Sequence, residues 1–307
     1  MKKYILLIAI AFIIISVQSC GKAKPVSSLQ KELSEYVEGR DANIGIAVII
    51  DRKDTVEVNG NHVFPMLSVY KFPIAVALGD YLRLSSALSP DTLTITQSDL
   101  KPDTYSPMRE KYEGEDTIQL PLYDIMAYAL QQSDNNASDI LLKIMGGTEN
   151  AMLALKRLGI DNVNIAYTED EMYEDHRLCY ENSSTPIAMA RLLDSFDHDF
   201  NDLYTRNVKQ LMETCATGVN RLAKPLAGTD AVVGHKTGTG FTLPDGRLMA
   251  INDVGYVHLP NGRNYSIAVF IENSGYDMEQ TEEIVAKISE IVYNNLSRQR
   301  LRQDVRF

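Results

Sequence analysis

Three serines beyond residue 20 stand three residues before a lysine, a spacing that can turn a serine into a nucleophile. The pairs are Ser28–Lys31, Ser68–Lys71 and Ser98–Lys101. On a helix, residues three apart share one face, so the lysine amine can take the proton of the serine hydroxyl. A chain of this length contains on the order of one such pair by chance. The spacing therefore gives candidates and does not yet give a site.

The surroundings of the three pairs differ. Ser28 opens an N-terminal helix, where a capping role explains the serine. Lys101 precedes Pro102, which disfavours helical geometry at Lys101. Ser68 lies at the entry to a long apolar helix, and a helix N-terminus favours developing negative charge. We therefore take Ser68 as the candidate nucleophile and Lys71 as its proton acceptor.

Two rarer triplets follow along the chain. Ser133-Asp134-Asn135 comes after a predicted helix, and Lys236-Thr237-Gly238 lies on a predicted late strand. Each triplet is expected on the order of 0.05 times by chance. Their ordinary explanations are a helix-joining turn and an edge-strand glycine. Three motifs in this order make those explanations weak.

Together the motifs resemble those of class A serine β-lactamases and penicillin-binding proteins. Ser133 follows Ser68 by 65 residues and precedes Lys236 by 103, separations similar to class A. The resemblance covers essentially the whole mature chain. It implies that Ser68 forms an acyl-enzyme with the lactam carbonyl, with Lys71 in the proton relay. It also implies that Ser133 protonates the departing nitrogen and that the N–H groups of Ser68 and Thr239 form an oxyanion hole.

The same resemblance implies a set of substrate-binding residues, which are Asn135, Lys236, Thr237, Gly238, Thr239, Arg221 and Tyr105. Asn135 would bind the side-chain amide, and Lys236 and Thr237 would face the substrate carboxylate. Arg221 resembles an arginine that some class A enzymes supply to that carboxylate, and an ordinary surface arginine is the alternative. Tyr105 resembles the aromatic residue at the cleft mouth, and a packed loop tyrosine is the alternative.

The deacylating glutamate of the family lies in the pattern Glu-x-x-Leu-Asn. Here we align Glu169 with the glutamate, Met172 with the leucine and Tyr173 with the asparagine. That asparagine normally helps to hold the hydrolytic water, so Tyr173 leaves open how the water is held. Glu171 and Glu174 are rival bases in the same acidic stretch, and a solvated loop without catalytic function is the alternative for all three. We favour Glu169.

This loop departs from the usual class A pattern in another way. The arginine–aspartate bridge that fastens it is missing, with Tyr167 and Asn182 near those places. A further departure is His235, which directly precedes Lys236. A cephalosporin-preferring, extended-spectrum branch of class A shares these departures, and we favour that branch.

Composition excludes several other classes of protein. The chain has 307 residues, 45% hydrophobic and 23% charged, so it is neither collagen-like nor disordered. A net charge of −11 repels phosphate backbones, so we expect no nucleic-acid partner. HExxH, His-x-His and Gly-rich phosphate loops do not occur. We interpret the acidic run at 194–199 as a helix–helix loop rather than a metal site, and expect no metal or cofactor and a monomer.

The N-terminus predicts export. Lys2 and Lys3 precede an apolar run at 4–17, which is too short for a membrane span and typical of a signal peptide, here 1–19. The next residue, Cys20, resembles a lipidated cysteine, although Gln18 is unusual there and ordinary cleavage nearby is the alternative. We expect a periplasmic protein that contacts the membrane only through a lipid at Cys20. We expect Cys179 and Cys215 to be buried and free.

Hydrophobic patterning places the motifs on a fold. Strands are predicted at 44–51, 55–58, 231–238, 248–258 and 265–272, with an Asn261-Gly262 hairpin turn. Helices are predicted in 69–84, 120–130, 140–145, 151–158, 187–196, 203–212 and 278–296. This order indicates an α/β domain of residues 20–66 and 217–307, with an all-α domain of residues 67–216 inserted. The resemblance implies a β-lactamase/penicillin-binding-protein-like fold, an antiparallel sheet flanked by helices.

The leading functional prediction is hydrolysis of β-lactam antibiotics, with cephalosporins preferred, which would give antibiotic resistance. The first alternative is a penicillin-binding peptidase that acts on cell-wall D-Ala-D-Ala termini. The second is a sensor domain that is acylated by β-lactams and does not turn them over. A site between the sheet and the helical insertion suits all three.

Overall fold

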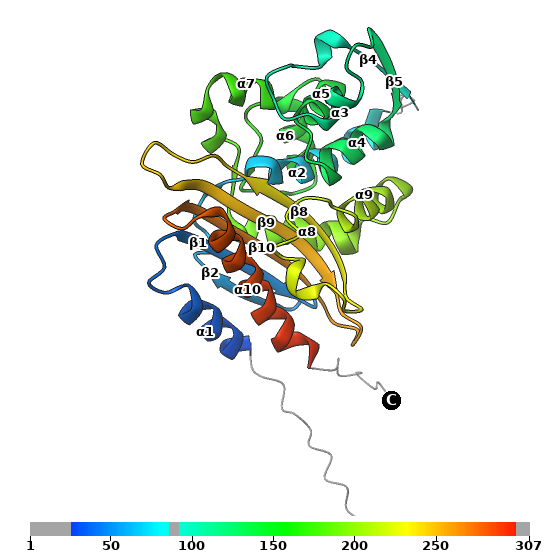
Figure 1. Cartoon of the computed structure of the whole chain (residues 1–307). Helices are drawn as coiled ribbons and strands as arrows, with labels where there is room; N and C mark the ends of the chain where they lie inside the picture. Colours follow the sequence, from blue (N-terminus) through cyan, green and yellow to red (C-terminus); the bar gives the residue numbers. More distant parts are fainter. Residues whose placement is uncertain (1–25, 86–91, 299–307) are drawn as a thin grey trace, which may run out of the picture.

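The computed structural model describes residues 26–85 and 92–298. The predicted signal peptide and Cys20 lie outside these residues. A five-stranded antiparallel sheet forms the lower part of the molecule in Figure 1, in the order β2-β1-β10-β9-β8. The strands are β1 (Asn43–Ile50), β2 (Asp54–Val58), β8 (Val232–Thr239), β9 (Leu248–His258) and β10 (Asn264–Ser274). Both ends of the chain therefore share one sheet, as the patterning predicts.

Both faces of the sheet are covered, which explains why its central strands are buried along almost their whole length. Helices α1 (Val26–Val37) and α10 (Met278–Ser297) lie on one face, and α8 (Pro186–Asp199) packs on the other. In β1, Ile46 and Val48 join the core beneath α10, whereas Ala47 and Ile49 join the core shared with the helical part. This alternation is the two-residue period of a strand with two apolar faces.

The inserted helices surround a central buried helix, α2 (Lys71–Ser85). Around it lie α4 (Leu122–Gln131), α5 (Asn135–Met145), α6 (Thr148–Arg157) and α9 (Leu203–Glu213). Pro73 is tolerated because it stands in the first turn of α2, where its missing N–H has no helical partner. The short 3₁₀ turn Leu67–Tyr70, which leads into α2, packs against β8 and β9.

The insertion is not purely helical, which corrects the predicted all-α composition of residues 67–216. A hairpin of β4 (Thr92–Thr96) and β5 (Thr117–Pro121) extends from it, and short strands β7 (Ser183–Ser184) and β6 (Val163–Asn164) pair beside β3 (Phe64–Pro65). A five-residue helix, α3 (Pro107–Lys111), also lies there. The helix predicted from residue 120 begins two residues later, because β5 continues through Pro121. The domain boundaries remain a prediction.

The acidic run at 194–199 is not a loop, because it forms the last turns of α8. Its charges are paired: Asp197 contacts His258 at 2.7 Å and Lys209 at 3.0 Å, and Asp194 contacts Arg52 at 3.3 Å. Among residues 26–85 and 92–298, no group of three or more histidines, cysteines or acids is arranged to hold a metal ion. The same residues contain no helix that is long and apolar enough to cross a bilayer.

Cys179 and Cys215 are free, and both are partly exposed rather than fully buried. Burial, together with the charge of Glu169, raises the pKa of the Cys179 thiol to about 11. At neutral pH this thiol is therefore protonated and a weak nucleophile.

Candidate active site

The amine of Lys71 lies at the centre of a compact polar cluster. Ser68 belongs to a short 3₁₀ turn (Leu67–Tyr70) that leads directly into α2. Lys71 Nζ is 3.0 Å from Ser68 Oγ, 2.6 Å from Asn135 Oδ1 and 2.8 Å from the carbonyl oxygen of Ser133. It also pairs with Glu169 Oε1 at 2.9 Å, although the lysine side chain is fully buried. Four oxygens from three separate segments thus surround one amine.

The loop between α4 and α5 brings Ser133 and Asn135 to that amine. Ser133 has φ +61°, a left-handed backbone that is unusual for a residue with a side chain. Asp134 holds the loop in this form, because its buried carboxylate accepts from the N–H of Ala137 at 2.8 Å and of Met108 at 2.7 Å. Burial raises the pKa of Asp134. Its side chain therefore supports the motif rather than the chemistry.

Strand β8 is the sheet edge that faces the helices, and it carries Lys236 into the cluster. Lys236 Nζ lies 2.9 Å from Ser133 Oγ. Gly238 is required by close packing, since a Cβ there would stand 2.5 Å from the carbonyl oxygen of Met66. Burial, with Lys71 nearby, lowers the pKa of Lys236 to about 7. The two lysines thus contact the same residue, Lys71 at the carbonyl oxygen of Ser133 and Lys236 at its hydroxyl.

The acidic segment forms a short helix, α7 (Glu169–Glu174), and its geometry distinguishes the three candidate glutamates. Glu171 folds back to cap its own helix, with Oε2 2.8 Å from the N–H of Thr168. Glu174 is exposed at the end of α7. Glu169 alone of the three contacts Lys71. The cluster therefore brings Ser68, Lys71, Ser133, Asn135, Lys236 and Glu169 together from the predicted list.

Two side chains hold this segment: Asn182, which stands near one place of the missing arginine–aspartate bridge, and Asp139, which the sequence did not point to. Asn182 is fully buried, and its Oδ1 accepts from the N–H of Ala166 at 2.7 Å and of Tyr167 at 2.9 Å. Asp139, on α5, accepts from the N–H of Glu169 at 2.8 Å and of Asp170 at 3.0 Å. Burial, and then the charge of Glu169, raises the pKa of Asp139 to about 7. These contacts hold the segment in the absence of the arginine–aspartate bridge.

Comparisons with known proteins agree with this geometry. The model of the β-lactamase enzyme family matches residues 28–296. A β-lactamase from Bacteroides uniformis is 37% identical over 96% of this chain and 99% of its own length. VEB-1 from Pseudomonas aeruginosa, also a β-lactamase, is 34% identical over 87% of this chain and 90% of its own length. A solved class A β-lactamase from Bacteroides cellulosilyticus superposes with a TM-score of 0.84, at 33% identity, over 90% of this chain and 99% of that chain.

The chain belongs to the class A serine β-lactamases. It is a hydrolase that opens the cyclic amide of β-lactam antibiotics. The predicted family, fold class and enzyme class are thereby confirmed, and the peptidase and sensor alternatives are not supported.

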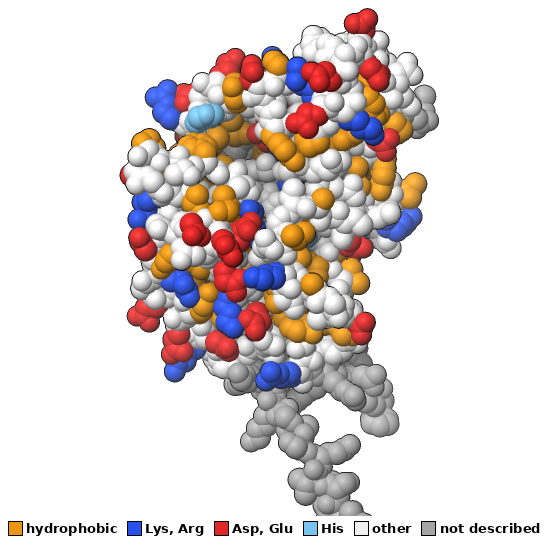
Figure 2. Space-filling view, viewed as in Figure 1, with side chains coloured by type: hydrophobic (Ala, Val, Ile, Leu, Met, Phe, Trp, Pro, Cys, Tyr) orange, Lys and Arg blue, Asp and Glu red, His pale blue; other side chains and the backbone are white. Residues whose placement is uncertain are grey.

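The cavity of this β-lactamase extends away from the cluster between α7 and the β8–β9 loop. It has a volume of about 170 Å³, and its lining includes Ser68 and Glu169 at one end and Tyr173, His176 and Phe241 at the other. The ring centroid of His176 lies 6.2 Å from that of Tyr173 and 5.1 Å from that of Phe241. Figure 2 shows the molecule hollowed between its upper helical part and the sheet, with hydrophobic side chains along the rim.

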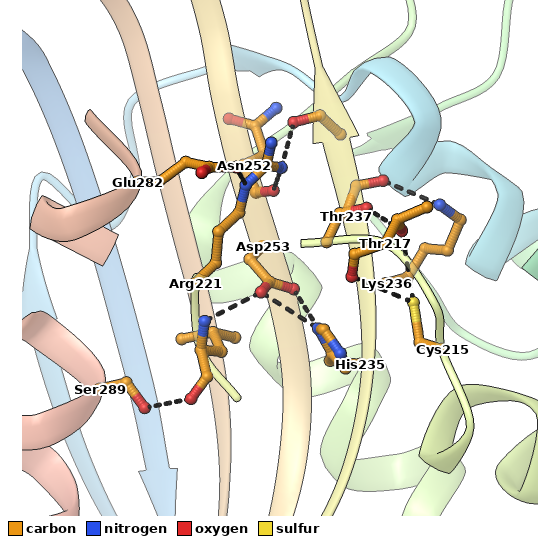
Figure 3. Close-up of polar contacts among 12 residues, drawn as sticks. Cys215, Thr217, Arg221, His235, Lys236, Thr237, Asn252, Asp253, Glu282 and Ser289 are labelled. Carbon is orange, nitrogen blue, oxygen red and sulfur yellow. Dashed lines mark hydrogen bonds and ion pairs between the residues drawn. The ribbon is translucent and has the colours of Figure 1, made fainter. Parts of the chain in front are cut away.

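Arg221 is not a surface residue, because its side chain is 4% exposed. Its guanidinium donates to Thr239 Oγ1 at 2.7 Å and to the carbonyl oxygens of Gly238 and Asn252 at 3.1 and 3.0 Å, and it pairs with Glu282 at 3.0 Å (Figure 3). Arg221 therefore meets the cleft through Thr239, which lines the cavity.

Thr237 and Tyr105 are the two remaining residues of the predicted substrate-binding set, and their surroundings differ from each other. Thr237 Oγ1 lies 2.6 Å from Thr217 Oγ1 on the side of β8 away from the cluster. Tyr105 has a side chain that is 56% exposed, so it is not a packed loop residue. Its carbonyl oxygen accepts from the N–H of Asn135 at 3.0 Å, and Thr104 beside it contacts Asn135 Nδ2 at 2.8 Å. The backbone around Tyr105 therefore helps to hold Asn135.

Proposed function

We propose that this β-lactamase hydrolyses cephalosporins in preference to other β-lactams, through an acyl-enzyme on Ser68 that Glu169 helps to clear. The observation that carries the proposal is the position of Lys71 Nζ, within 3.0 Å of both Ser68 Oγ and Glu169 Oε1. Nucleophile, amine and carboxylate are thus in direct contact before substrate binds. That arrangement supports both halves of a hydrolytic cycle.

Acylation begins when Ser68 Oγ attacks the lactam carbonyl carbon and its proton passes to a base. Lys71 Nζ lies 3.0 Å from Ser68 Oγ, so its amine is in position to receive the serine proton. The carbonyl oxygen becomes negative in the tetrahedral intermediate, and the N–H groups of Ser68 and Thr239 would stabilise it. Both residues line the cavity.

The intermediate collapses when the bond between carbonyl carbon and lactam nitrogen breaks. The nitrogen then takes a proton from Ser133 Oγ, which recovers one from the lysines beside it. Lys236 Nζ donates to Ser133 Oγ at 2.9 Å, so the serine's own hydrogen is directed elsewhere and can reach the substrate. The carboxylate of the β-lactam would bind near Lys236, Thr237 and Thr239, and its side-chain amide would bind Asn135.

Deacylation requires a water that is both positioned and deprotonated. One oxygen of Glu169 pairs with Lys71, and the other can accept a proton from a water that attacks the ester carbon. Asp139 holds the N-terminal turn of α7 and so fixes where Glu169 lies. The ester bond breaks, Ser68 recovers its proton through Lys71, and the opened product leaves.

The preference for cephalosporins has two supports. One relative, an enzyme named extended-spectrum β-lactamase PER-1 from Pseudomonas aeruginosa, is 28% identical over 86% of this chain. The cavity beyond Glu169 also has a wall of Tyr173, His176 and Phe241, which gives room and apolar surface to a large side chain on the antibiotic.

The cellular setting belongs to the same proposal. An apolar N-terminus with Cys20 after it supports export to the periplasm, with or without a lipid on that cysteine. The negative surface gives no argument for an oligomer, so we propose a monomer.

Replacing Glu169 with alanine tests the mechanism. General-base catalysis contributes about 10²–10⁴-fold, and Lys71 can still support acylation. Glu169→Ala should therefore bind a chromogenic cephalosporin covalently and then stall, with turnover lower by at least about a hundredfold. Intact-mass spectrometry should show a persistent adduct on Ser68.

The matched controls are Glu171→Ala and Glu174→Ala, which should keep turning over. If either control accumulates the adduct while Glu169→Ala does not, the deacylating base is another glutamate of α7. If the wild type hydrolyses penicillins faster than cephalosporins, the preference is refuted although the mechanism stands.

A further inference from the structure

The face of β8 opposite Lys236 makes side-chain contacts at three alternate positions along the strand. His235, Thr237 and Thr239 share this face, because side chains alternate along a strand and Lys236 points to the other side. Thr237 contacts Thr217 at 2.6 Å, and Thr239 contacts Arg221 at 2.7 Å. Both partners lie on the segment 217–222, which we call the 217–222 loop. The remaining position, His235, is fastened through Asp253.

His235 and Asp253 form a buried ion pair, seen at the centre of Figure 3. His235 Nδ1 lies 2.9 Å from Asp253 Oδ1, and the two side chains are 5% and 0% exposed. Asp253 Oδ2 also accepts from the N–H of Leu222 at 3.1 Å, and the carbonyl oxygen of Leu222 accepts from Ser289 Oγ at 2.8 Å. One carboxylate therefore joins β8, β9, the 217–222 loop and, through that loop, α10.

The neighbouring strand β9 leaves room for a side chain at position 235. Gly255 pairs with His235 across the two strands, and a Cβ at Gly255 would stand 2.9 Å from the Cβ of His235. Burial lowers the pKa of His235, but the charge of Asp253 outweighs it and raises the pKa to about 9. The pair is therefore ionic at neutral pH, which leaves neither buried group without a partner.

We propose that His235 and Asp253 are positioning residues, which hold β8 against the 217–222 loop and thereby set where Lys236 meets Ser133 and the substrate carboxylate. β8 is the last strand of the sheet, so β9 supports it through backbone hydrogen bonds on one side. The position of β8 relative to the cleft therefore also depends on side-chain contacts, such as the one between His235 and Asp253. Thr237, directly opposite Asp253, links the pair to Lys236.

Several charged or titratable groups face Lys236 from the elements packed on it, and the test must separate position from charge. They are Lys71 on α2, Glu169 on α7, Cys215 after α9 and Asp253 on β9, with His235 adjacent on β8. Asparagine in place of Asp253 removes the charge. It keeps an oxygen for the N–H of Leu222 and a donor for a neutral imidazole. Threonine and alanine break both contacts.

The inference rests on the proposed binding of the substrate carboxylate by Lys236, so two matched substrates are needed. One is a chromogenic cephalosporin with a free ring carboxylate, and the other is its methyl ester. The ratio of kcat/KM values for acid over ester measures what the carboxylate contributes. Asp253→Thr and Asp253→Ala should lower this ratio about tenfold, mainly through KM for the acid, as expected when one charge-assisted hydrogen bond is lost.

Asp253→Asn should restore most of the ratio, because it rebuilds the contacts without the charge. The control is His258→Ala, which breaks the His258–Asp197 pair. His258 lies on the same strand as Asp253, about 14 Å along β9 from Val254, the cross-strand partner of Lys236, and Asp197 lies on α8. His258→Ala should leave the ratio unchanged.

Equal losses for acid and ester in the Asp253 variants would overturn the inference, as would the same fall in ratio in His258→Ala. Failure of Asp253→Asn to restore the ratio would also overturn it, because charge rather than position would then matter. If the wild type itself hydrolyses acid and ester equally well, the proposed carboxylate site at Lys236 fails instead. The two failures are thus distinguishable.

Discussion

Replacing Asp139 should separate the effect of its hydrogen bonds from the effect of its charge. Its carboxylate accepts from the N–H groups of Glu169 and Asp170 and so holds the first turn of α7. Since α7 has six residues, it is too short to be stable alone. We therefore expect Asp139→Ala to free Glu169 and to slow deacylation more than acylation.

The charge of Asp139 opposes folding, whereas its hydrogen bonds support it. The pKa rises from 3.8 to about 7 in the folded protein, so between these values the folded protein holds a proton that the unfolded chain has released. This stabilising contribution is full below the unfolded pKa and is lost as the pH rises through the folded pKa. A pKa rise of about three corresponds to ~4 kcal/mol in the free energy of unfolding. Partial contact of the carboxyl group with water reduces this contribution to about 2 kcal/mol.

Urea unfolding of wild type and Asp139→Ala at pH 5 and pH 8 measures this difference. At pH 5 the variant should lose about 2 kcal/mol, from two hydrogen bonds of roughly 1 kcal/mol each. At pH 8 the loss should be smaller by about 1–1.5 kcal/mol, because the variant also removes the unfavourable charge and only the part of the contribution between pH 5 and the folded pKa is compared. Asp161→Ala, at an exposed aspartate, is the control and should show no such pH dependence. Equal losses at both pH values would refute the reasoning, because Asp139 would then be ionised in both states.

Ser68→Ala should abolish hydrolysis, because among residues 26–85 and 92–298 no other hydroxyl lies within hydrogen-bond distance of the Lys71 amine. Ser28→Ala should keep wild-type rates, and activity above background in Ser68→Ala would overturn the mechanism. Arg221→Ala should lower kcat/KM for cephalosporins about ten- to a hundredfold, the worth of a charge-assisted hydrogen bond, since Thr239 loses its buried donor. Unchanged kcat/KM across several cephalosporins would exclude Arg221 from carboxylate binding. A fatty-acid analogue should label the wild type in its native host and leave Cys20→Ala unlabelled; an unlabelled wild type would indicate cleavage without lipidation.

Local spacing predicted the central chemistry because that chemistry depends on neighbours in the sequence. Ser68 and Lys71 are one helical turn apart, so their contact at 3.0 Å needs no distant partner. The late strands were also predictable. Residues 248–258 form β9 with the predicted bounds, because an apolar run covered on both faces has a strong pattern of its own.

Residue type alone did not distinguish the three glutamates or place the arginine. Glu169 and Glu171 are equally acidic, and only the fold turns one toward Lys71 and the other toward its own helix N-terminus. Arg221 is in a short stretch without a clear pattern, and its burial depends on β8, β9 and α10 meeting around it. The acidic run at 194–199 was misread for the same reason, since its partners come from remote strands and helices.

By itself, the sequence determined the reactive groups, their order and the strand–helix–strand plan, because spacing and periodicity encode contacts within a turn or along a strand. Only the tertiary structure decided which carboxylate meets the amine, how Asp139 and Asn182 hold α7, and that His235 and Asp253 lie behind Lys236. Each of these contacts joins segments that are far apart in the chain. Their geometry depends on how the sheet and the helices pack, and no local pattern records that packing.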